Sequence, residues 1–453
     1  MDHSEENVTQ FVFDGVIEES RKYSNILESK INKRSNFMFY LLNETVSMYK
    51  GMKLQLEHPQ IQKLFLNSSE YHFDLFIYEC ILCPFMALAD IYDCPVVMTL
   101  SIDPPNMFHH LIGNAVNPSI SPPIEILPYI HGKLSFVVRL QSFFMDLLIR
   151  FMNIFFLKIS DFMLYQKFTD IEFASQVDIV HKRVMLYYSF TSHLTTSIRP
   201  TVPYYHQLGF IHVKPPKDIM DIKVRDFLDS SNNGVVVVCF GSVATELNDE
   251  YYSIFLAAFK ELPFNVIWKI VPEHSNRLDI PDNIKTVEWL QFDDVLAHKN
   301  VKVVIAHAGL RTIEEAIDRE VPMVLIPINY DQPFNALYQV EHKIATKIDL
   351  NKLTKESLKE AIMEMTKSKY KENIKIIRNQ AYDRMMSSLD EAVENIEHLI
   401  KFNDTIWIEN YPLQFKYGIL EFIHIIKIEV DLNPKNSWKD VDRDGNVLDI
   451  GNW

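Results

Sequence analysis

Residues 301–335 carry polar side chains whose types and spacing suit a phosphorylated ligand. His307 follows an apolar run that predicts a strand, and Ala308-Gly309 then turns the chain into a predicted helix. A glycine at such a turn lets a ligand approach the backbone closely. The free N–H groups and the dipole at the start of the helix favour an anion such as phosphate. The pattern therefore predicts an anion site around His307 and Gly309.

Hydroxyl, carboxylate and amide groups follow in the same segment. Thr312 lies in the first turn of the predicted helix and can donate a hydroxyl. Glu315, three residues later, lies on the same helix face and can accept two hydrogen bonds from a diol such as ribose. Asp331 and Gln332 follow the next apolar run and suit the hydroxyls of a sugar. Each residue alone has an ordinary structural explanation, but their order and spacing together favour ligand binding.

The elements that must position these residues alternate between strand and helix. Apolar runs predict strands at 235–240, 265–270, 285–289, 301–306, 323–328 and 345–348, and helices at 251–262, 310–319 and 333–342. Such alternation predicts a parallel, doubly wound sheet that binds its ligand at the carboxyl ends of the strands. A closing helix is predicted to begin with a capping box formed by Ser388 and Glu391.

The N-terminal half has a less regular pattern. Strands are predicted at 73–78, 95–100, 184–190 and 202–208, and six prolines between residues 101 and 130 predict an irregular wall. A proline-containing polar stretch predicts a connector. We therefore expect an N-terminal domain at 1–213, a connector at 214–233, a C-terminal domain at 234–402 and a tail at 403–453.

Composition narrows the classes of protein that fit. A chain of 453 residues exceeds what one hydrophobic core usually serves, so two domains are expected. The net charge of −15 argues against a nucleic-acid partner, although one helix terminus can still bind a phosphate. The four cysteines are too few for a disulfide scaffold, and the Cys80–Cys83 pair lacks the further ligands of a metal site. We expect inert thiols and no metal.

An apolar stretch at 143–157 has two interpretations. It contains Asp146 and Arg150, which share a helix face, and it is shorter than the ~20 residues that span a membrane. A core helix is the favoured interpretation, and an in-plane helix in peripheral contact with a membrane is the alternative. The sequence shows neither a signal peptide nor a spanning helix.

Residues 289–336 resemble the signature of the UDP-glycosyltransferases, most of all those of insects. The family has Trp-Leu-Pro-Gln, His-Gly-Gly-x-x-Ser-x-x-Glu-Ala and Asp-Gln, where this chain has WLQF at 289–292, HAGLRTIEEA at 307–316 and Asp331-Gln332. The resemblance implies an α/β protein of the GT-B fold with two Rossmann-like, doubly wound domains. It also implies transfer of a hexose from a UDP-sugar co-substrate to a hydroxyl of a small lipophilic acceptor, without a metal or other cofactor.

The resemblance implies a role for each matching residue. Trp289 would stack on uracil, and Glu315 would hold the ribose hydroxyls. The diphosphate would contact Ser242, His307, Ala308, Gly309 and Thr312, and the donor sugar would contact Asp331 and Gln332.

Four positions where this chain differs from the family bear on the site. Phe292 replaces a glutamine at the uridine end, and Arg311 adds a cation that either helps to bind phosphate or points to solvent. Ala308 and Glu320 replace glycines. Either residue would be strained if its backbone were left-handed, at a cost of about 1 kcal/mol for Ala308.

The resemblance also implies a catalytic histidine that the sequence does not show. In the family a His shortly after the first strand takes the acceptor's proton and is oriented by an acidic residue. Glu79 stands where that acid is expected. The first βαβ unit, which would carry the His, is expected to be absent, so the N-terminal domain is expected to be incomplete. Two hypotheses follow, a hexosyltransferase and a non-catalytic protein that binds a UDP-sugar or a partner. The family implies the endoplasmic reticulum lumen or membrane, and a homo-oligomer stays open.

Overall fold

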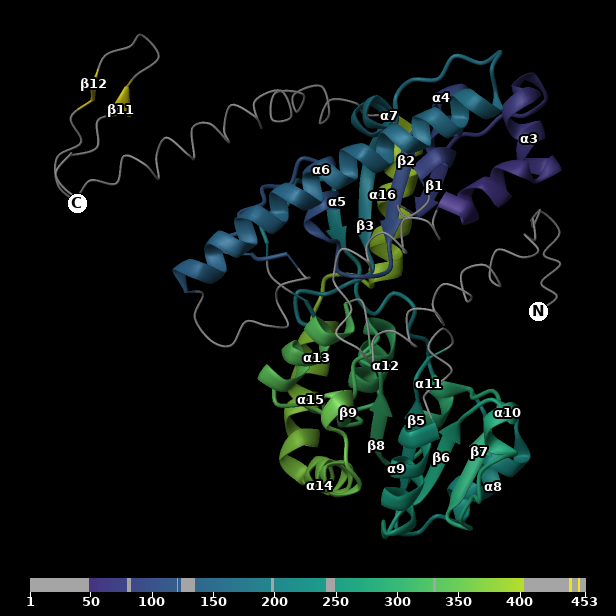
Figure 1. Ribbon diagram of the computed structural model, residues 1–453, viewed down its shortest axis with the longest axis vertical. Coiled ribbons are helices and arrows are strands. Elements are labelled where there is room, and N and C mark those ends of the chain that lie inside the picture. Colours follow the sequence, from purple (N-terminus) through teal and green to yellow (C-terminus); the bar gives the residue numbers. More distant parts are fainter. Residues whose placement is uncertain are drawn as a thin grey trace. The chain divides into compact units, whose positions relative to one another are not determined.

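The computed structural model describes residues 49–79, 83–119, 121–123, 135–196, 199–241, 249–328 and 331–402, together with the backbone of 440–441 and 447–448. Residues 49–402 hold two parallel sheets with helices packed around them (Figure 1). The predicted α/β class is confirmed. In the tail, two short strands pair antiparallel, β11 (Asp440–Val441) and β12 (Val447–Leu448).

The sheet of the C-terminal half is doubly wound. Its strand order is β10-β9-β8-β5-β6-β7, and every neighbouring pair is parallel. The strands are β5 (Val235–Cys239), β6 (Asn265–Lys269), β7 (Ile284–Val287), β8 (Val301–Ala306), β9 (Met323–Leu325) and β10 (Ala345–Lys347). The chain leaves β5 toward β6 and returns on its other side as β8, so the order reverses between β5 and β8. Doubly wound sheets bind ligands in the crevice at such a reversal.

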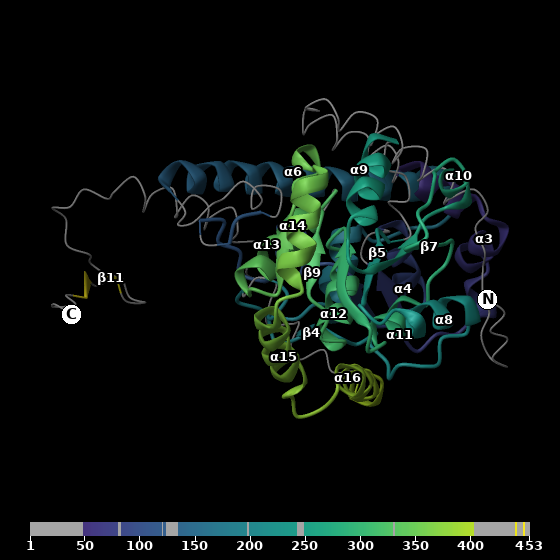
Figure 2. The same ribbon diagram turned by 90° about the horizontal axis from the view of Figure 1, so that it is seen from below.

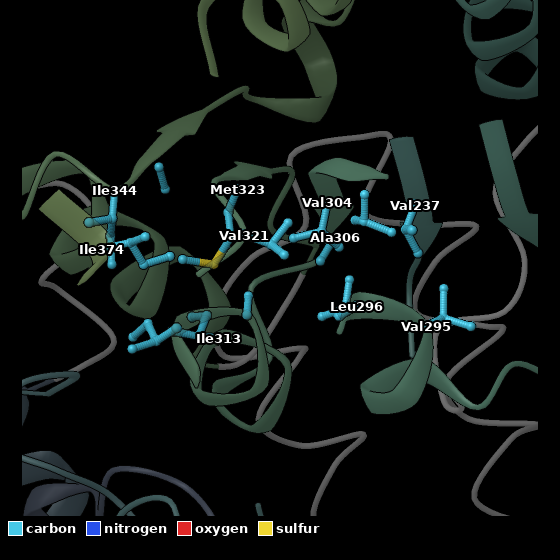
Figure 3. Packing of buried hydrophobic residues seen from close by; sticks show 14 of the residues in the cluster. Val237, Val295, Leu296, Val304, Ala306, Ile313, Val321, Met323, Ile344 and Ile374 are labelled. Carbon is cyan, nitrogen blue, oxygen red and sulfur yellow. The ribbon is translucent and has the colours of Figure 1, made fainter. Parts of the chain in front are cut away.

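Helices cover both faces of this sheet because successive residues of a strand point to opposite faces. Val237 and Ala306 pack on one face with Leu296 and Ile313, which come from helices (Figure 3). Val238 and Ile305 pack on the other. The helices of this half are α8 (Ile222–Ser230), α9 (Asp249–Lys260), α10 (Pro272–Ser275), α11 (Phe292–Leu296), α12 (Leu310–Asp318), α13 (Gln332–Glu341), α14 (Lys355–Met365), α15 (Ser368–Tyr382) and α16 (Ser388–Phe402).

Part of the predicted connector is helical. α8 lies inside residues 214–233, and its Val224 and Leu228 join the same core cluster as Val237. Asp221 begins the helix by accepting hydrogen bonds from the N–H groups of Lys223 and Val224. This stretch therefore packs onto the C-terminal sheet, and the domain boundaries stay a prediction.

The sheet of the N-terminal half has the order β1-β2-β3-β4, again all parallel. Its strands are β1 (Phe76–Glu79), β2 (Val96–Leu100), β3 (Val184–Ser189) and β4 (Tyr205–Gln207), and its helices are α3 (Pro59–Leu66), α4 (Ala87–Ile91), α5 (Asn106–Leu111), α6 (Phe136–Lys167) and α7 (Gln176–Arg183). All four predicted strands are present, although the last is shorter than expected. Within the described part of residues 101–123, α5 is the only α-helix, as the prolines predicted. The expected missing βαβ unit concerns residues before 49, outside the described part.

The apolar stretch at 143–157 lies within α6, a helix of 32 residues. Asp146 is buried on this helix and accepts a hydrogen bond from Nε of Arg150 at 3.0 Å, which confirms their expected pairing. Phe144 and Phe151 are 59% and 67% exposed, so the core-helix interpretation is right for one face only. Across the described residues, no helix is long and apolar enough to cross a membrane.

The predicted capping box of α16 is wrong by one residue. The N–H of Asp390 donates to the hydroxyl of Ser387, and that hydroxyl donates to the Asp390 carboxylate. Ser388 instead donates to the carbonyl of Gly209 at 2.6 Å. A long-range contact therefore uses the hydroxyl that local spacing assigned to the cap, because the neighbouring serine caps equally well.

Candidate functional site

His307 lies at the carboxyl end of β8, where the strand order reverses. Its imidazole is enclosed by two glycines. A Cβ built on Gly309 would lie 2.7 Å from His307 Nε2, and one on Gly241 would lie 2.9 Å from Cε1. Neither glycine can therefore carry a side chain without moving the ring. Burial, together with the cation of Lys269, lowers the pKa of His307 to about 4, so the ring is neutral at pH 7 and can donate one N–H.

Lys269 and Trp289 come to this edge from β6 and from the loop after β7. The Lys269 ammonium donates to the carbonyl of Gly241 at 2.9 Å and lies 5.1 Å from the centre of the Trp289 ring. Trp289 is 65% exposed, which leaves its ring available for a planar ligand group. Lys269 is a site residue that the sequence reasoning missed. Its signal was its position next to the end of the apolar run 265–270, which predicts a strand.

α12 begins directly after the His307 turn. Gly309 is its N-cap residue and carries no side chain, so no side chain caps the first N–H groups of the helix. Thr312 is half-buried in that first turn. Ala308 has φ +68, so the glycine replacement does fall at a left-handed position and costs about 1 kcal/mol or more. The backbone donors at this helix start point to an anion site.

Glu315 follows one turn further along α12 and is 8% exposed. Burial raises its pKa to about 7, although the guanidinium of Arg311 acts to lower it. Arg311 Nε lies 3.4 Å from Glu315 Oε1. Arg311 is three-quarters exposed and binds the carboxylate rather than pointing only to solvent. Glu315 can accept hydrogen bonds from a diol once ionised.

Asp331 and Gln332 start α13 and are both buried. The Gln332 carbonyl oxygen accepts the N–H of Ile328 at 2.9 Å. The amide of Asn335 donates to the Asp331 carboxylate at 2.6 Å and to the carbonyl of Ala308 at 3.1 Å. Asn335 thus links Asp331, which is predicted to bind the sugar, to the turn after β8. It was also missed, and its signal was the i,i+4 spacing from Asp331.

Glu79 ends β1 in the N-terminal half. Its carboxylate accepts the hydroxyl of Thr99 at 3.1 Å and the N–H of Ser101 at 3.3 Å. These contacts fix the acid at the carboxyl end of the sheet. Ser242 lies outside the described residues. Phe292 starts α11 and packs against the core.

The described residues include no group of three or more His, Cys, Asp or Glu side chains placed to hold a metal ion. Cys94 and Cys239 are buried free thiols, as expected. The remaining two cysteines have side chains outside the described part. At this edge the described residues bring together Lys269, the neutral His307, the backbone donors of α12 and the buried carboxyl groups of Glu315 and Asp331.

Known proteins resemble this chain in sequence. A family described as UDP-glucoronosyl and UDP-glucosyl transferase matches residues 14–405. A UDP-glucosyltransferase 2 of Dactylopius coccus is 34% identical over 205 residues, which cover 45% of this chain and 39% of that protein. The UDP-glucuronosyltransferase 2B7 of Homo sapiens is 26% identical over 347 residues, covering 75% of this chain and 64% of that protein. The chain thus spans less than two thirds of the length of either relative.

The architecture has solved counterparts. The glycotransferase of kitacinnamycin is 18% identical with a TM-score of 0.53, and the match covers 78% of this chain and 82% of that one. At this identity the likeness concerns the fold alone, which is GT-B as expected.

Proposed function

The chain belongs to the UDP-glucoronosyl and UDP-glucosyl transferase family, and from that premise we propose that it transfers a hexose from a UDP-sugar to a hydroxyl of a small lipophilic acceptor. The observation that carries the proposal is the neutral His307, enclosed by Gly241 and Gly309 at the point where the strand order reverses. A ring held there, beside uncapped helix N–H groups and the Lys269 cation, suits a diphosphate.

The donor would lie across the carboxyl ends of the strands. Uracil would stack on the exposed Trp289 ring, and Glu315 would accept the two ribose hydroxyls. The diphosphate would contact His307 and Lys269, and its negative charge would benefit from the α12 dipole. Asp331 and Gln332 would face the sugar, held in place through Asn335 and the Ile328 N–H. Ser242 stays in the proposal on the family pattern alone.

The acceptor side supports a second candidate, a protein that binds UDP-sugars without transferring them. Within the described residues Glu79 is hydrogen bonded by Thr99 and Ser101 and by no histidine. The base that such an acid would orient is not among the contacts of Glu79 in the described part of the chain. The two candidates share the donor site and differ in whether an acceptor hydroxyl is deprotonated.

Calorimetry with UDP, followed by a transfer assay, tests both candidates. We expect UDP to bind the folded protein, and His307→Ala and Glu315→Gln each to weaken binding at least about tenfold, since each removes a charge-assisted or buried hydrogen bond. Lys302→Gln is the control, because this exposed residue lies at the opposite end of β8. Absence of binding by the wild type would exclude both candidates, and unchanged affinity in both variants would show that the site is elsewhere. Binding without transfer from UDP-glucose or UDP-glucuronate to a phenol would favour the second.

We also propose that α6 makes peripheral contact with an anionic membrane. The buried residues of α6 include Ser142, Asp146, Ser160 and Asp161 beside Ile149, Leu157, Met163 and Leu164, while many of its other large apolar side chains face outward. The large side chains of α6 that are exposed are Phe136, Val137, Leu140, Phe144, Leu147, Phe151, Ile154, Phe155, Phe162 and Tyr165. Such a face suits the interfacial zone of a bilayer, and it agrees with the location in the endoplasmic reticulum that the family implies.

The exposed charged residues of α6 favour an anionic lipid. Both acidic side chains of α6 are buried, whereas Arg139, Lys158 and Lys167 are exposed on it, in a chain of net charge −15. Vesicles containing phosphatidylserine should therefore bind the protein, and Phe144→Gln with Phe151→Gln should release it, whereas Met385→Gln, an exposed residue elsewhere, should not. Flotation of the vesicles in a density gradient measures the fraction of protein bound. Loss of self-association in the same variant, without vesicle binding by the wild type, would instead assign the face to a second copy of the chain.

A further inference from the structure

A buried carboxyl group of α12 holds the turn at residues 209–210, which follows β4. The N–H of Phe210 donates to Oε2 of Glu314 at 2.8 Å, and Glu314 is 1% exposed. Phe210 has φ +62, a left-handed conformation that costs a non-glycine residue roughly 1–2 kcal/mol. The turn therefore depends on hydrogen bonds to residues outside it, and Glu314 of α12 supplies one of them.

The packing around this carboxyl group leaves little freedom. A Cβ built on Gly209 would lie 3.0 Å from Oε1 of Glu314 and 2.6 Å from Cβ of Ser192. Burial raises the pKa of Glu314 to about 8, although the Phe210 N–H and the hydroxyl of Thr195 lower it. The group is mainly protonated at pH 7, so a glutamine of the same shape can accept the same hydrogen bond.

His212 lies between this turn and Glu315, the carboxylate that we propose binds ribose. Its Nδ1 lies 3.7 Å from Oε2 of Glu314, and its Nε2 lies 3.9 Å from Oε1 of Glu315. Burial, followed by the guanidinium of Arg311, lowers the pKa of His212 to about 4, so the ring is neutral. Its Nε2 is buried without a hydrogen-bond partner. A small shift of Glu315 toward His212 would supply that partner.

We propose that Glu314 is a positioning residue that couples the 209–210 turn to the nucleotide site through His212 and Glu315. The inference rests on the proposed function, since Glu315 is there the residue that holds ribose. Glu314 and Glu315 are consecutive on one helix, so a movement of α12 that brings Glu315 onto a ribose also moves the acceptor of the Phe210 N–H. By reciprocity, if loss of the Glu314 contact weakens nucleotide binding, bound nucleotide must tighten that contact by the same factor.

The first test needs no ligand. Amide hydrogen exchange at residues 209–213 is compared in the wild type, Glu314→Gln, Glu314→Ala and Ser388→Ala. We expect Glu314→Ala to speed exchange at Phe210 about tenfold or more, because it leaves a buried N–H without an acceptor, and Glu314→Gln to restore the wild-type rate. Equal rates in folded Glu314→Ala and wild type would overturn the assignment of Glu314 to this turn.

The second test adds UDP. It distinguishes coupling between the turn and the nucleotide site from a role of Glu314 in holding the turn alone. In the wild type UDP should slow exchange at residues 209–213, and in Glu314→Ala UDP should bind about tenfold more weakly and leave that exchange unchanged. Ser388→Ala removes the hydrogen bond to the Gly209 carbonyl from α16 and should keep UDP affinity within about twofold, because α12 is untouched. If Glu314→Ala does not fold, the wild type alone decides, since bound UDP without effect on residues 209–213 refutes the coupling. A wild type that does not bind UDP refutes the proposed function and with it the coupling, while the first test still judges the role of Glu314 in the turn.

Discussion

The guanidinium of Arg311 lies 3.4 Å from the carboxylate of Glu315, one turn further along α12. The pair places a cation in the first turn of a helix, where the dipole disfavours positive charge. Arg311 is the exposed member of the pair, and fully exposed pairs at this spacing stabilise a helix by only ~0.3–0.5 kcal/mol. We therefore propose that Arg311 also contacts an anion bound at the helix start.

Replacing Arg311 should separate phosphate binding from ribose binding. We expect Arg311→Gln to weaken UDP about fivefold, through loss of one charge-assisted contact, and to leave uridine affinity within about twofold. Calorimetry with both ligands measures the difference, and Lys302→Gln controls for the loss of one positive charge. An equal loss for UDP and uridine would mean that Arg311 acts only by holding Glu315.

The affinity for uridine should depend on pH. The pKa of Glu315 is raised to about 7 by its burial, and the ionised form is the better acceptor of two ribose hydroxyls. Affinity should therefore rise about tenfold from pH 6 to pH 8, with release of a proton on binding. Uridine is chosen because it has no phosphate that titrates in this range. Titrations in two buffers of different ionisation enthalpy count the proton, and Glu315→Gln should bind weakly with a flat profile.

The enclosure of His307 predicts a steric effect of Gly309→Ala. Gly309 has φ −64, so alanine is tolerated by the backbone, but its Cβ would collide with the imidazole. We expect UDP affinity to fall at least about tenfold while the denaturation midpoint changes little, because the displaced ring no longer reaches the diphosphate. In a His307→Ala background the same substitution should have no further effect on affinity. Additive losses in this double-mutant cycle would contradict the proposed contact.

Two left-handed residues just after helices should be sites of stabilisation. Glu320 follows the end of α12 with φ +54, and Lys343 follows the end of α13 with φ +57. Glycine at either position should raise the free energy of unfolding by about 1 kcal/mol, because glycine adopts a left-handed backbone conformation without the strain that a Cβ causes. Glu360→Gly, inside α14 and exposed, should instead lower it by about 1 kcal/mol. Urea denaturation measures all three, and a Glu320→Gly variant as unstable as Glu360→Gly would count against the strain.

The sequence by itself determined the α/β class and most of the strands, and it gave the order of the residues from Trp289 to Gln332 that we propose bind the nucleotide. These depend on local periodicity and short spacings, which a single segment carries. His307 at a strand end and Glu315 on the following helix needed no knowledge of distant residues, because a strand and a helix project side chains at known intervals.

The tertiary structure decided which distant groups meet at that edge. Lys269 reaches Trp289 because β6 lies beside β7 and next to β5, and Asn335 reaches Ala308 because α13 packs beside the turn after β8. Glu314 holds Phe210 across 104 residues of sequence. Ser388 likewise donates to the carbonyl of Gly209 instead of capping α16 as predicted. Such contacts follow from strand order and from the packing of helices on the sheets, and no local spacing encodes them.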